Sequence, residues 1–503
     1  MKKAITSLTI ILGMNFVQLY ANNVQISNVT LLPANKLQFN ISWENSWRMS
    51  TPPANYDAVW IFIKRSFCSD PNVWYHTNVA PSGHQVGTPL EVIVDGADAK
   101  KNYAGLFLQR AGYGSGDIQN VQVQVAMDGF TAGEYEFKVF AVEMVYINQG
   151  PHWAGDWYSS NGASAESRFY NGADPWNGGA YEVINEAYSI PMGYNCANCL
   201  GGDGLSGTLP AGFPKGYNAI YCMKYEVTQS QMADFFNHAP QAIYDRWSPD
   251  IVTNAYGQIA LTTGWGNLSF RYPWRPFTTG QQTSDFTRPV LLFWTYLDWA
   301  ALRPMTELEY EKICRGPSII GTTPHPWVIN EFAWGTAQIY VFNLNDAVID
   351  EVNEGTDSET HSVALSPTQG IANLYRWGGY NDQTNSDLYR VGFAAKSNTT
   401  RTTSGATYYG VMDMTGNAWE GTVMVTNGST FQGYAGDGLL SSDHYYQQNT
   451  WFPIGNLLGL TNYRGGGVTG WLNYEGPNRW MVASRLSGNG IWSHNCYQFR
   501  GVR

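Results

Sequence analysis

The sequence predicts an α+β protein in which an all-β, sandwich-like domain precedes a larger, irregular α+β domain. Short runs of alternating hydrophobic and polar residues fill residues 22–147, which is typical of antiparallel strands. Residues 148–185 are rich in Gly, Asn and Ser without periodicity, so they are expected to form a linker. Residues 186–503 hold three helix starts embedded in long loops, and this region is expected to be the second folded domain.

Composition limits the functions that the chain can have. Its 503 residues exceed one ordinary domain, and with 44% hydrophobic and 15% aromatic residues it has ample material for cores. Only 14% of the residues are charged, the net charge is -11, and no Lys/Arg cluster is present, so nucleic-acid binding has no electrostatic support. Many aromatic residues beside few charges favour an extracellular protein with binding surfaces, although large aromatic cores would give the same composition.

The first 21 residues have the pattern of an export signal. Lys2 and Lys3 precede an apolar run from Ile5 to Val17, and Ala21 offers a small residue for cleavage. No later stretch of the sequence is apolar enough to span a membrane. Residues 1–21 are therefore expected to be a signal peptide, and the protein is expected to be secreted, periplasmic or exposed at the cell surface.

Six cysteines are present, and an even number in an exported chain permits disulfides. Cys196 and Cys199 form a single CxxC motif, which is a weak zinc signal without a second pair. A local disulfide or two free thiols is therefore favoured over a metal or redox role. The eight histidines form no HExxH or HxH pair, so a histidine-based transition-metal site is not indicated.

Within residues 22–147, period-two alternation marks the individual strands. The alternating hydrophobic positions are Leu37, Phe39, Ile41 and Trp43, then Val121, Val123 and Val125, then Tyr135, Phe137 and Val139. The continuous apolar run from Ala58 to Lys64 predicts a more deeply buried strand. Turn-forming Gly, Pro and Asn residues separate these runs, so we expect an antiparallel sandwich.

Three capping signals predict helices in residues 186–503. Thr228–Gln231 and Thr306–Glu309 fit the capping box, in which the Thr side chain and the residue three positions later bond reciprocally to backbone amides. Thr295–Asp298, after the apolar run PVLLFW, is a weaker cap. The helix that begins after Thr306 should stop at Gly316-Pro317. The remaining loops are long, and buried loop backbone needs cross-links such as disulfides or bound cations.

The segment GVMDMTGNAWEG, from Gly410 to Gly421, is apolar enough to be buried, yet it carries two carboxylates, Asp413 and Glu420. Its glycines argue against a single regular strand or helix. The two carboxylates have three candidate roles: acid–base chemistry, binding of a cation, or hydrogen bonding within turns. The residues alone leave these three roles open.

Five motifs occur in a fixed order through the last two-thirds of the chain. They are YCMKYEVTQSQMADFFN, RPVLLFWTYLDWAALRPMTELEYEKICRG, GVMDMTGNAWEG, RGGG and FRGVR. In this order they resemble the formylglycine-generating enzyme family, also called the sulfatase-modifying factor family, over residues 186–503. The family's G-N-x-W-E-W pattern has Gly421 in place of its last Trp here. The resemblance implies an irregular α+β fold that is related to C-type lectins.

The resemblance also implies two calcium sites. One would use Asp413, Gly416, Ala418 and Glu420, and the other Asn373, Leu374, Asp387 and Tyr389. Calcium takes about six to eight hard oxygen ligands, and flexible loops supply these as carboxylate and carbonyl oxygens. Structural calcium is therefore the expected cofactor. The alternative is that Asp413 and Glu420 only cap turns by hydrogen bonding.

The same resemblance argues against the family's copper chemistry in this chain. Members that make formylglycine bind copper through two cysteines shortly after the R-G-G-S motif, because soft thiolates select Cu(I). Here the segment from Arg464 to Ser487 contains no cysteine, and none occurs between Cys314 and Cys496. Copper is therefore not expected, and Arg464 and Arg485 are expected to be structural.

Aromatic and amide side chains interleave after the RGGG motif, and this combination suits binding of a peptide, a glycan or another protein. The candidate ligand-binding residues are Trp471, Asn473, Tyr474, Glu475, Trp492 and His494. The alternative is that the Trp residues belong to the core and the Asn residues to turns.

Three functions remain open. The first is an exported, non-catalytic protein for binding or surface assembly, since family members without the cysteine pair occur among bacterial cell-surface proteins. The second is an oxidoreductase of the family with an altered active site that uses Glu475, His494 or Cys496. The third is a diversified ligand-binding protein, because lectin-fold relatives of the family place variable residues in the segment that corresponds to residues 470–497.

Overall fold

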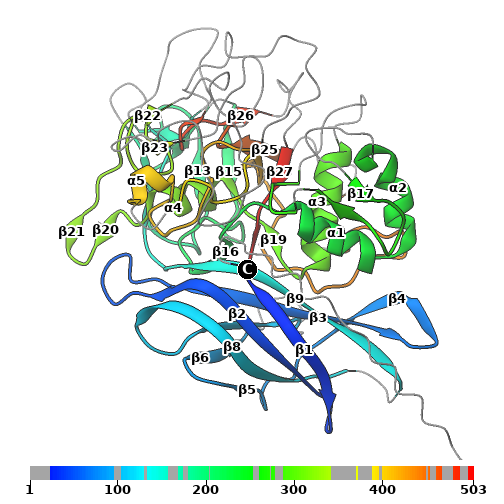
Figure 1. Cartoon of the computed structure of the whole chain (residues 1–503). Helices are drawn as coiled ribbons and strands as arrows, with labels where there is room; N and C mark the ends of the chain where they lie inside the picture. Colours follow the sequence, from blue (N-terminus) through cyan, green and yellow to red (C-terminus); the bar gives the residue numbers. More distant parts are fainter. Residues whose placement is uncertain are drawn as a thin grey trace, which may run out of the picture.

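The computed structural model describes residues 23–95, 103–129, 133–156, 168–173, 179–202, 204–252, 260–271, 273–277, 287–340, 370–371, 388–395, 399–448, 451–453, 460–466, 480–487 and 497–503. Two parts of the molecule are visible in Figure 1: a lower part made of strands, and an upper part that combines helices, short strands and long loops. The protein therefore belongs to a mixed class that is mainly β, with few helices.

Alternating hydrophobic residues build the strands of the N-terminal part. These strands are β1 (Gln25–Leu32), β2 (Lys36–Arg48), β3 (Asp57–Phe67), β4 (Asp70–Thr77), β5 (Gln85–Val86), β6 (Leu90–Val94), β7 (Leu106–Arg110), β8 (Gly114–Ala126) and β9 (Tyr135–Ile147). One sheet has the order β1-β2-β8-β5, and its inner face packs on β3, β7 and β9 of a second sheet around a hydrophobic core. The strands predicted from alternation are thus confirmed.

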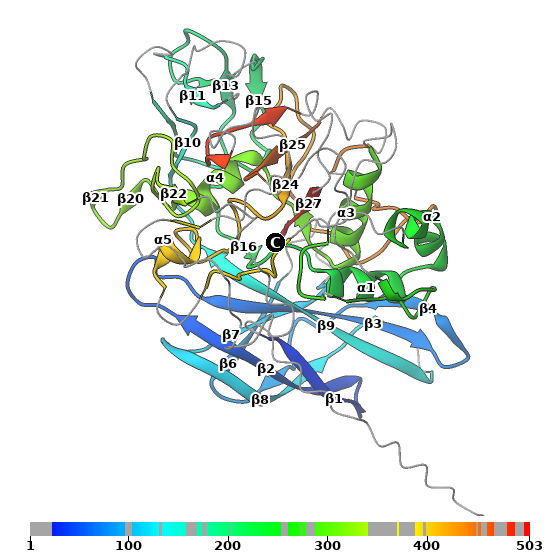
Figure 2. The ribbon, with the colours of Figure 1, turned by 45° about the horizontal axis from the view of Figure 1, so that its top comes forward.

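The second sheet extends beyond the N-terminal part. Its order is β19-β28-β16-β9-β3-β7-β6, with β4 paired to β3, and three of its strands come from the C-terminal part: β16 (Ile220–Met223), β19 (Arg303–Pro304) and β28 (Gly501–Val502). β9 and β16 are antiparallel, so that Ile147 pairs with Ile220 and Met144 with Met223. One hydrogen-bonded sheet therefore runs through both predicted domains, and in Figure 2 it lies between the strand-only part and the helices.

Sharing this sheet buries strand β3 on both faces. Val59, Ile61 and Ile63 point into the core of the N-terminal sandwich, whereas Trp60 and Phe62 belong to the larger core that includes the helices. A strand that is covered on both faces needs apolar residues at successive positions, and this explains the continuous apolar run in the sequence. The prediction of a deeply buried strand here is confirmed, since each side chain from 57 to 64 is buried.

The described helices are α1 (Gln229–His238), α2 (Gln241–Val252), α3 (Thr287–Trp299), α4 (Glu307–Arg315) and α5 (Arg401–Ser404). Both predicted capping boxes form, at Thr228 and at Thr306, and α4 ends at Gly316 with a positive φ of 89°. The predicted cap at Thr295 is wrong, because α3 begins eight residues earlier and contains it. The Thr295 hydroxyl donates instead to the carbonyl oxygen of Leu291, 2.7 Å away within the helix.

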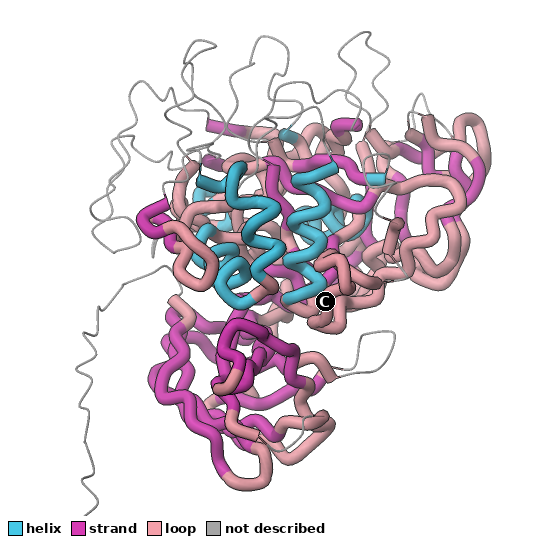
Figure 3. Tube along the Cα trace, turned by 90° about the vertical axis from the view of Figure 1, so that its right-hand side faces the viewer, coloured by secondary structure: helices cyan, strands magenta, loops and turns pink. Residues whose placement is uncertain are grey.

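The remaining strands are short and lie in the C-terminal part. They are β10 (His152–Ala154), β11 (Tyr170–Asn171), β12 (Tyr181–Val183), β13 (Ile190–Met192), β14 (Leu200–Gly201), β15 (Gly207–Leu209), β17 (Ala260–Thr262), β18 (Ser269–Phe270), β20 (Ile319–Ile320), β21 (Thr323–Pro324), β22 (Ile339–Tyr340), β23 (Gly370–Ile371), β24 (Trp419–Val423), β25 (Thr461–Arg464), β26 (Leu486–Ser487) and β27 (Tyr497–Phe499). Figure 3 shows the helices gathered in this part, apart from the strand-only sandwich. Over the described residues, no helix is long and apolar enough to cross a membrane.

Described portions of residues 148–185, which were expected to be a linker, are built into the C-terminal part. β10 pairs with β12, so that His152 is opposite Val183, and His152 is fully buried. The backbone amide of Gly155 donates a hydrogen bond to the carboxylate of Glu311 on α4. These segments therefore pack on the C-terminal part instead of merely connecting two domains.

A buried lysine joins the shared sheet to the loops above it. The Lys64 ammonium on β3 donates to the carbonyl oxygens of Trp299, at 2.8 Å, and Gly438, at 2.7 Å. Burial lowers the pKa of Lys64 well below its usual value, and the negative charge of Asp298 opposes this shift. On the same strand, the Trp60 indole N–H donates to the carbonyl oxygen of Ala300 at 2.9 Å. The two parts are thus fixed by directional bonds as well as by apolar packing.

The shared sheet predicts that damage to β3 destabilises both parts together. We expect Trp60→Ala to lower the free energy of unfolding by about 3–5 kcal/mol, because it leaves a large cavity in the core and an unpaired Ala300 carbonyl. Urea denaturation followed by circular dichroism and by tryptophan fluorescence should show one transition, shifted equally for both probes.

Val29→Ala is the matched control, because Val29 lies on β1 with 40% of its surface exposed. This change should alter the free energy of unfolding by no more than about 0.5 kcal/mol. A Trp60→Ala variant in which only the N-terminal part unfolds early, in a separate transition, would contradict the prediction that the parts unfold together.

Candidate functional site

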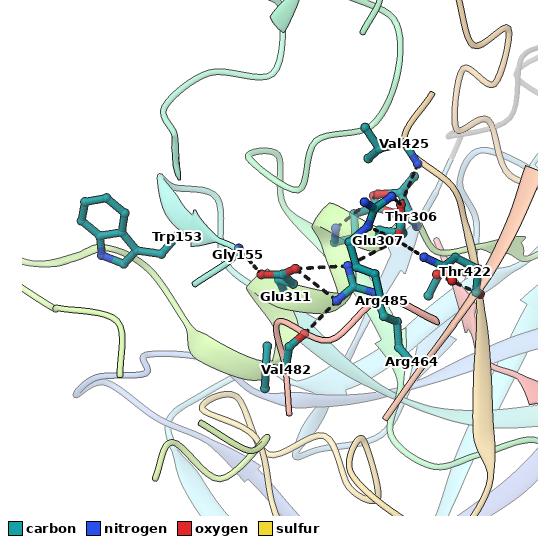
Figure 4. A network of polar contacts seen from close by, with 12 residues as sticks. Trp153, Gly155, Thr306, Glu307, Glu311, Thr422, Val425, Arg464, Val482 and Arg485 are labelled. Atoms are coloured by element: carbon teal, nitrogen blue, oxygen red, sulfur yellow. Dashed lines mark hydrogen bonds and ion pairs between the residues drawn. The ribbon is translucent and has the colours of Figure 1, made fainter. Parts of the chain in front are cut away.

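Helix α4 lies at the centre of a buried network of charges, which Figure 4 shows. Each of its nine residues is buried, including Glu307, Glu309 and Glu311. Glu307 accepts two hydrogen bonds from the Arg485 guanidinium, at 2.8 and 2.9 Å, and one from the Asn462 amide at 2.6 Å. Burial opposes its ionisation, yet the positive charges of the nearby arginines hold the pKa of Glu307 below its usual value.

The other two glutamates of α4 are paired as well. Glu309 accepts two bonds from the Arg303 guanidinium, at 2.6 and 2.8 Å, and completes the capping box at Thr306. Glu311 accepts bonds of 3.1 Å from Arg464, and it also pairs with Arg315. Each carboxylate thus has an arginine partner in the interior, because an unpaired buried charge is strongly unfavourable, and for Glu307 and Glu311 a partner comes from a distant part of the chain.

Arg464 and Arg485, which the sequence predicted to have a structural role, form buried ion pairs with α4. Both are almost fully buried, and each is paired with a glutamate of α4. Arg464 also donates to the carbonyl oxygen of Val482 at 2.8 Å, which ties the start of the RGGG motif to the segment around Arg485. These guanidinium groups are therefore committed to the network.

A second buried network surrounds the segment GVMDMTGNAWEG. The carboxylate of Glu420 on β24 accepts hydrogen bonds from the guanidinium of Arg500, with nitrogen–oxygen distances of 2.5 and 3.2 Å. Arg500 belongs to the FRGVR motif, and it also donates to the carbonyl oxygens of Met223, at 3.1 Å, and Lys224, at 2.9 Å. One arginine thus joins three of the motifs that carry the resemblance.

Two further buried carboxyl groups lie near Glu420. Asp413 has a positive φ of 60°, and its carboxylate accepts a bond from the backbone amide of Gly392 at 2.5 Å. Glu226, in the first motif, accepts bonds from the Asn417 amide at 2.6 Å and from the Ala418 backbone amide at 3.0 Å. We call Glu226, Asp413 and Glu420 the carboxylate cluster.

Burial dominates the electrostatics of the carboxylate cluster. It raises the pKa of Asp413 and of Glu420, and it raises the pKa of Glu226 well above its usual value, with the charge of Asp413 as the next cause. Positive charge comes from Arg500 and from Arg390, which acts on Asp413. Three ionised carboxylates would thus exceed two guanidinium groups by one negative charge, and this favours either a shared proton or an added cation.

The backbone positions predicted as calcium ligands lie between these carboxyl groups. Gly416 has a φ of 94°, and its amide donates to the Gly465 carbonyl oxygen of the RGGG motif at 2.9 Å. The amide of Ala418 is held by Glu226, as described above. Asp413, Gly416, Ala418 and Glu420 therefore all lie in one buried, bent segment.

Only one residue of the second predicted calcium set can be placed. Tyr389 is buried, its amide donates to the side-chain oxygen of Asn417 at 3.1 Å, and its carbonyl oxygen accepts from the Asn417 side chain at 3.2 Å. Asn373, Leu374 and Asp387 lie outside the described residues. Tyr389 therefore adjoins the carboxylate cluster through Asn417.

The donor set of the first site fits a hard cation, on two grounds. Its side chains are carboxylates, which exceed their guanidinium partners by one negative charge when all three are ionised, and the bent backbone offers carbonyl oxygens. In the part of the chain that the structure describes, no three His, Cys, Asp or Glu side chains form a metal-ligand group by themselves. Backbone carbonyl oxygens would therefore have to complete the set, and Glu420 would share its charge between the ion and Arg500.

Gly421 replaces the expected Trp of the G-N-x-W-E-W pattern for a steric reason. A Cβ atom at this position would lie 2.1 Å from the ring of Phe499, which pairs with Gly421 in the parallel strands β24 and β27. The Phe499 ring also packs against Phe293 of α3, with ring centroids 5.4 Å apart. Phe499 therefore occupies the space beside position 421.

The cysteines that the structure describes do not form a copper-binding pair. Cys196 and Cys199 form a disulfide, which is one of the two states expected for them. Cys222 and Cys314 are fully buried in an apolar cluster, and burial raises the pKa of both thiols. Burial thus disfavours the thiolate form of both, which is the form that binds copper. Cys68 is exposed in the N-terminal part, and Cys496 lies outside the described residues.

The predicted ligand-binding residues cannot be placed. Trp471, Asn473, Tyr474, Glu475, Trp492 and His494 all lie outside the described residues. Their described neighbour Trp480 is 3% exposed and packs with Phe332 and Trp334. At this one position, a tryptophan of the segment belongs to the core.

Sequence reasoning missed Glu226 as part of the site. Its motif was quoted for the resemblance, but a single Glu between apolar residues gives no sign of its partners, which lie some 190 residues away at Asn417 and Ala418. The available signal was an acidic residue between Tyr225 and Val227 in a mainly apolar run, since a buried carboxylate demands a hydrogen-bond partner.

Comparisons with known proteins add no assignment. A search against models of protein families and a search of curated proteins both returned no match.

The α4 network predicts that Arg485→Met is strongly destabilising. The change leaves the carboxylate of Glu307 buried without its closest cation, and such losses cost about 3–5 kcal/mol. Lys138→Met is the control, because the pair of Lys138 and Asp234 is exposed and 3.8 Å apart, and it should cost less than about 1 kcal/mol. Urea denaturation measures the change in the free energy of unfolding for both variants. Equal changes would show that the buried pair of Glu307 and Arg485 stabilises the fold no more than the exposed pair does.

Proposed function

We propose that the chain is an exported, non-catalytic protein for binding or surface assembly, whose C-terminal part is a calcium-stabilised domain of the formylglycine-generating enzyme type. The observation that carries this proposal is the carboxylate cluster. Glu226, Asp413 and Glu420 come from two separate motifs, are buried, and when ionised carry more negative charge than their arginine partners offset.

The arrangement of the five motifs supports the relationship to that family. The first, third and fifth motifs meet where Arg500 bonds Glu420 and the carbonyl oxygens of Met223 and Lys224. The second and fourth meet where Arg464 pairs with Glu311 of α4. Motifs that occur in family order along the chain thus also pair with one another in space, which chance similarity of short sequences would not require.

Calcium would add the positive charge that the carboxylate cluster lacks. Asp413 and Glu420 would hold one ion together with the carbonyl oxygens of Gly416 and Ala418. Asn373, Leu374, Asp387 and Tyr389 would hold a second. Arg500 would remain on Glu420, and Glu226 would keep the intervening backbone in place through its bonds to Asn417 and Ala418. The chemistry supplied by the ion is structural, because it cross-links loops.

The absence of catalysis rests on the cysteines. Formylglycine chemistry in the family needs two thiolates after the R-G-G-S motif, and the corresponding segment of this sequence has none. The buried thiols Cys222 and Cys314 face the apolar core that contains Met305 and Tyr310. We therefore propose a binding function, with a protein, peptide or glycan as the partner. Residues 1–21 would direct the protein to the periplasm or the cell surface.

Removal of calcium should destabilise the purified protein. A ligand present at 100 times its dissociation constant contributes about 2.7 kcal/mol to folding, so a calcium chelator should lower the melting temperature by several degrees. Asp413→Ala should lower the melting temperature without chelator and reduce the further effect of chelation. Asp128→Ala, an exposed change in the N-terminal part, should leave the chelator effect intact.

Metal analysis of the same preparation separates the proposal from its alternatives. Calcium at about one or two ions per chain, with no copper or iron, is the expected composition. The protein should not oxidise a cysteine peptide of the sulfatase type, with or without added copper. Either peptide turnover above a metal-free blank, or a redox metal bound stoichiometrically, would refute the non-catalytic function.

A further inference from the structure

A cleft of about 740 Å³ lies between the two parts of the molecule. Its volume falls within the range of roughly 300–1,000 Å³ that is usual for small-molecule sites. Tyr146 of β9 and Tyr221 of β16 line it from the shared sheet, whereas Tyr217 and Tyr434 line it from loops of the C-terminal part. The residues that line it are all described, whereas the predicted ligand-binding residues at 471–494 lie outside the described part of the chain.

One wall of the cleft is a loop that a buried lysine holds in shape. The Lys215 ammonium donates to four backbone carbonyl oxygens, those of Glu186, Pro210, Ala211 and Phe213, at 2.8 to 3.1 Å. The side chain of Lys215 is completely buried, and burial lowers its pKa to about 8. Such a set of bonds fixes the course of the loop before any ligand arrives.

A carboxylate fixes the same loop from the other side. Glu186, which itself lines the cleft, accepts bonds from the backbone amides of Lys215, Tyr217 and Asn218, at 2.5 to 3.0 Å. Lys312 of α4 donates to the carbonyl oxygens of Tyr217, at 3.1 Å, and Asn218, at 3.4 Å. Three charged side chains thus preorganise a loop that presents Tyr217 and Asn218 to the cleft.

The second loop and the floor are also fixed. Gly433 touches Pro214 so closely that an added Cβ would lie 2.2 Å from that ring, and the Tyr434 carbonyl oxygen accepts from the Trp451 indole at 2.8 Å. The Tyr434 residue nevertheless remains 38% exposed. On the floor, Tyr146 stacks on Tyr56 with ring centroids 4.6 Å apart. The cleft therefore presents tyrosine rings on a rigid frame.

Each charged side chain that lines the cleft lies close to a charge of opposite sign; for Glu186 these are the ammonium groups of Lys215 and Lys312. Arg503 pairs with Asp95 at 2.6 Å, and Arg303 pairs with Glu309 at 2.6 Å. The remaining polar lining residues are mainly amides: Gln149, Asn185, Asn218 and Gln432. Amides and tyrosine hydroxyls both donate and accept hydrogen bonds, as a ligand rich in hydroxyl groups requires. A strongly charged ligand would find no uncompensated charge of opposite sign among these pairs.

The sheet itself argues against an extended peptide as the ligand. A peptide that adds a strand needs an open strand edge. Both strands at the floor are interior strands, because β9 pairs with β3 and β16, and β16 pairs with β9 and β28. The floor therefore offers side chains instead of backbone groups.

We propose that this cleft binds a neutral oligosaccharide, with tyrosine rings against the sugar faces and amides on the hydroxyl groups. The proposal specifies the binding role inferred above but does not depend on calcium, so metal analysis and sugar titration can succeed or fail separately.

The test is calorimetric titration of the full protein with four neutral hexasaccharides: maltohexaose, cellohexaose, laminarihexaose and xylohexaose. We expect millimolar or tighter binding of at least one of them. Tyr434→Ala should weaken that binding about tenfold through loss of the ring, whereas Tyr434→Phe should stay within about threefold of the unchanged protein.

Tyr113→Ala is the matched control, since Tyr113 is 74% exposed on a turn of the N-terminal part and does not line the cleft. It should leave the affinity unchanged. The proposal fails if none of the four sugars binds, if Tyr434→Ala binds as well as the control variant, or if an acidic oligosaccharide or an unrelated peptide competes more strongly than the neutral sugar. Melting curves of each variant verify that the fold is intact.

Discussion

The pairing of buried glutamates with distant arginines organises the C-terminal part. Helix α4 has no exposed face, and three of its nine residues are glutamates whose charges require partners in the interior. Arg464 lies 153 residues from Glu311 along the chain, and Arg485 lies 178 residues from Glu307. The described parts of these intervening stretches hold only short strands and one short helix, so the ion pairs fix where the chain crosses α4. The capping box at Thr306 sets the start of α4 and thereby the side on which each glutamate points.

The same principle recurs wherever loop backbone is buried. Lys64 and Lys215 direct their ammonium groups at carbonyl oxygens, and Arg500 binds both a carboxylate and two carbonyl oxygens. A buried side-chain cation with such a set of oxygen atoms does the work that a metal ion does in other loop-rich proteins. Calcium at the carboxylate cluster would thus be one cross-link among several, placed where the arginines leave negative charge unbalanced.

Local patterns in the sequence predicted local structure well. Alternation located β2, β8 and β9, the apolar run at 58–64 located β3, and two capping boxes located the starts of α1 and α4. The sequence could not reveal which residues far apart in the chain contact each other. The pairing of β9 with β16 has no local signature, and Glu226 gave no indication that it would meet Asn417. Thr295 was misplaced because a Thr can bond back within a helix as readily as it can cap one.

The shared sheet has a consequence for how the protein would act on a surface. Two domains joined by a flexible linker sample many orientations, but β9 and β16 pair over four successive residues of one sheet, and Lys64 and Trp60 bond across the same junction. Bending between β9 and β16 would break the hydrogen bonds of the sheet, so the sandwich holds the C-terminal part in a fixed orientation. If the N-terminal sandwich is anchored, the C-terminal part is held at a fixed distance and angle from the anchor. A ligand bound to the C-terminal part then faces one direction only.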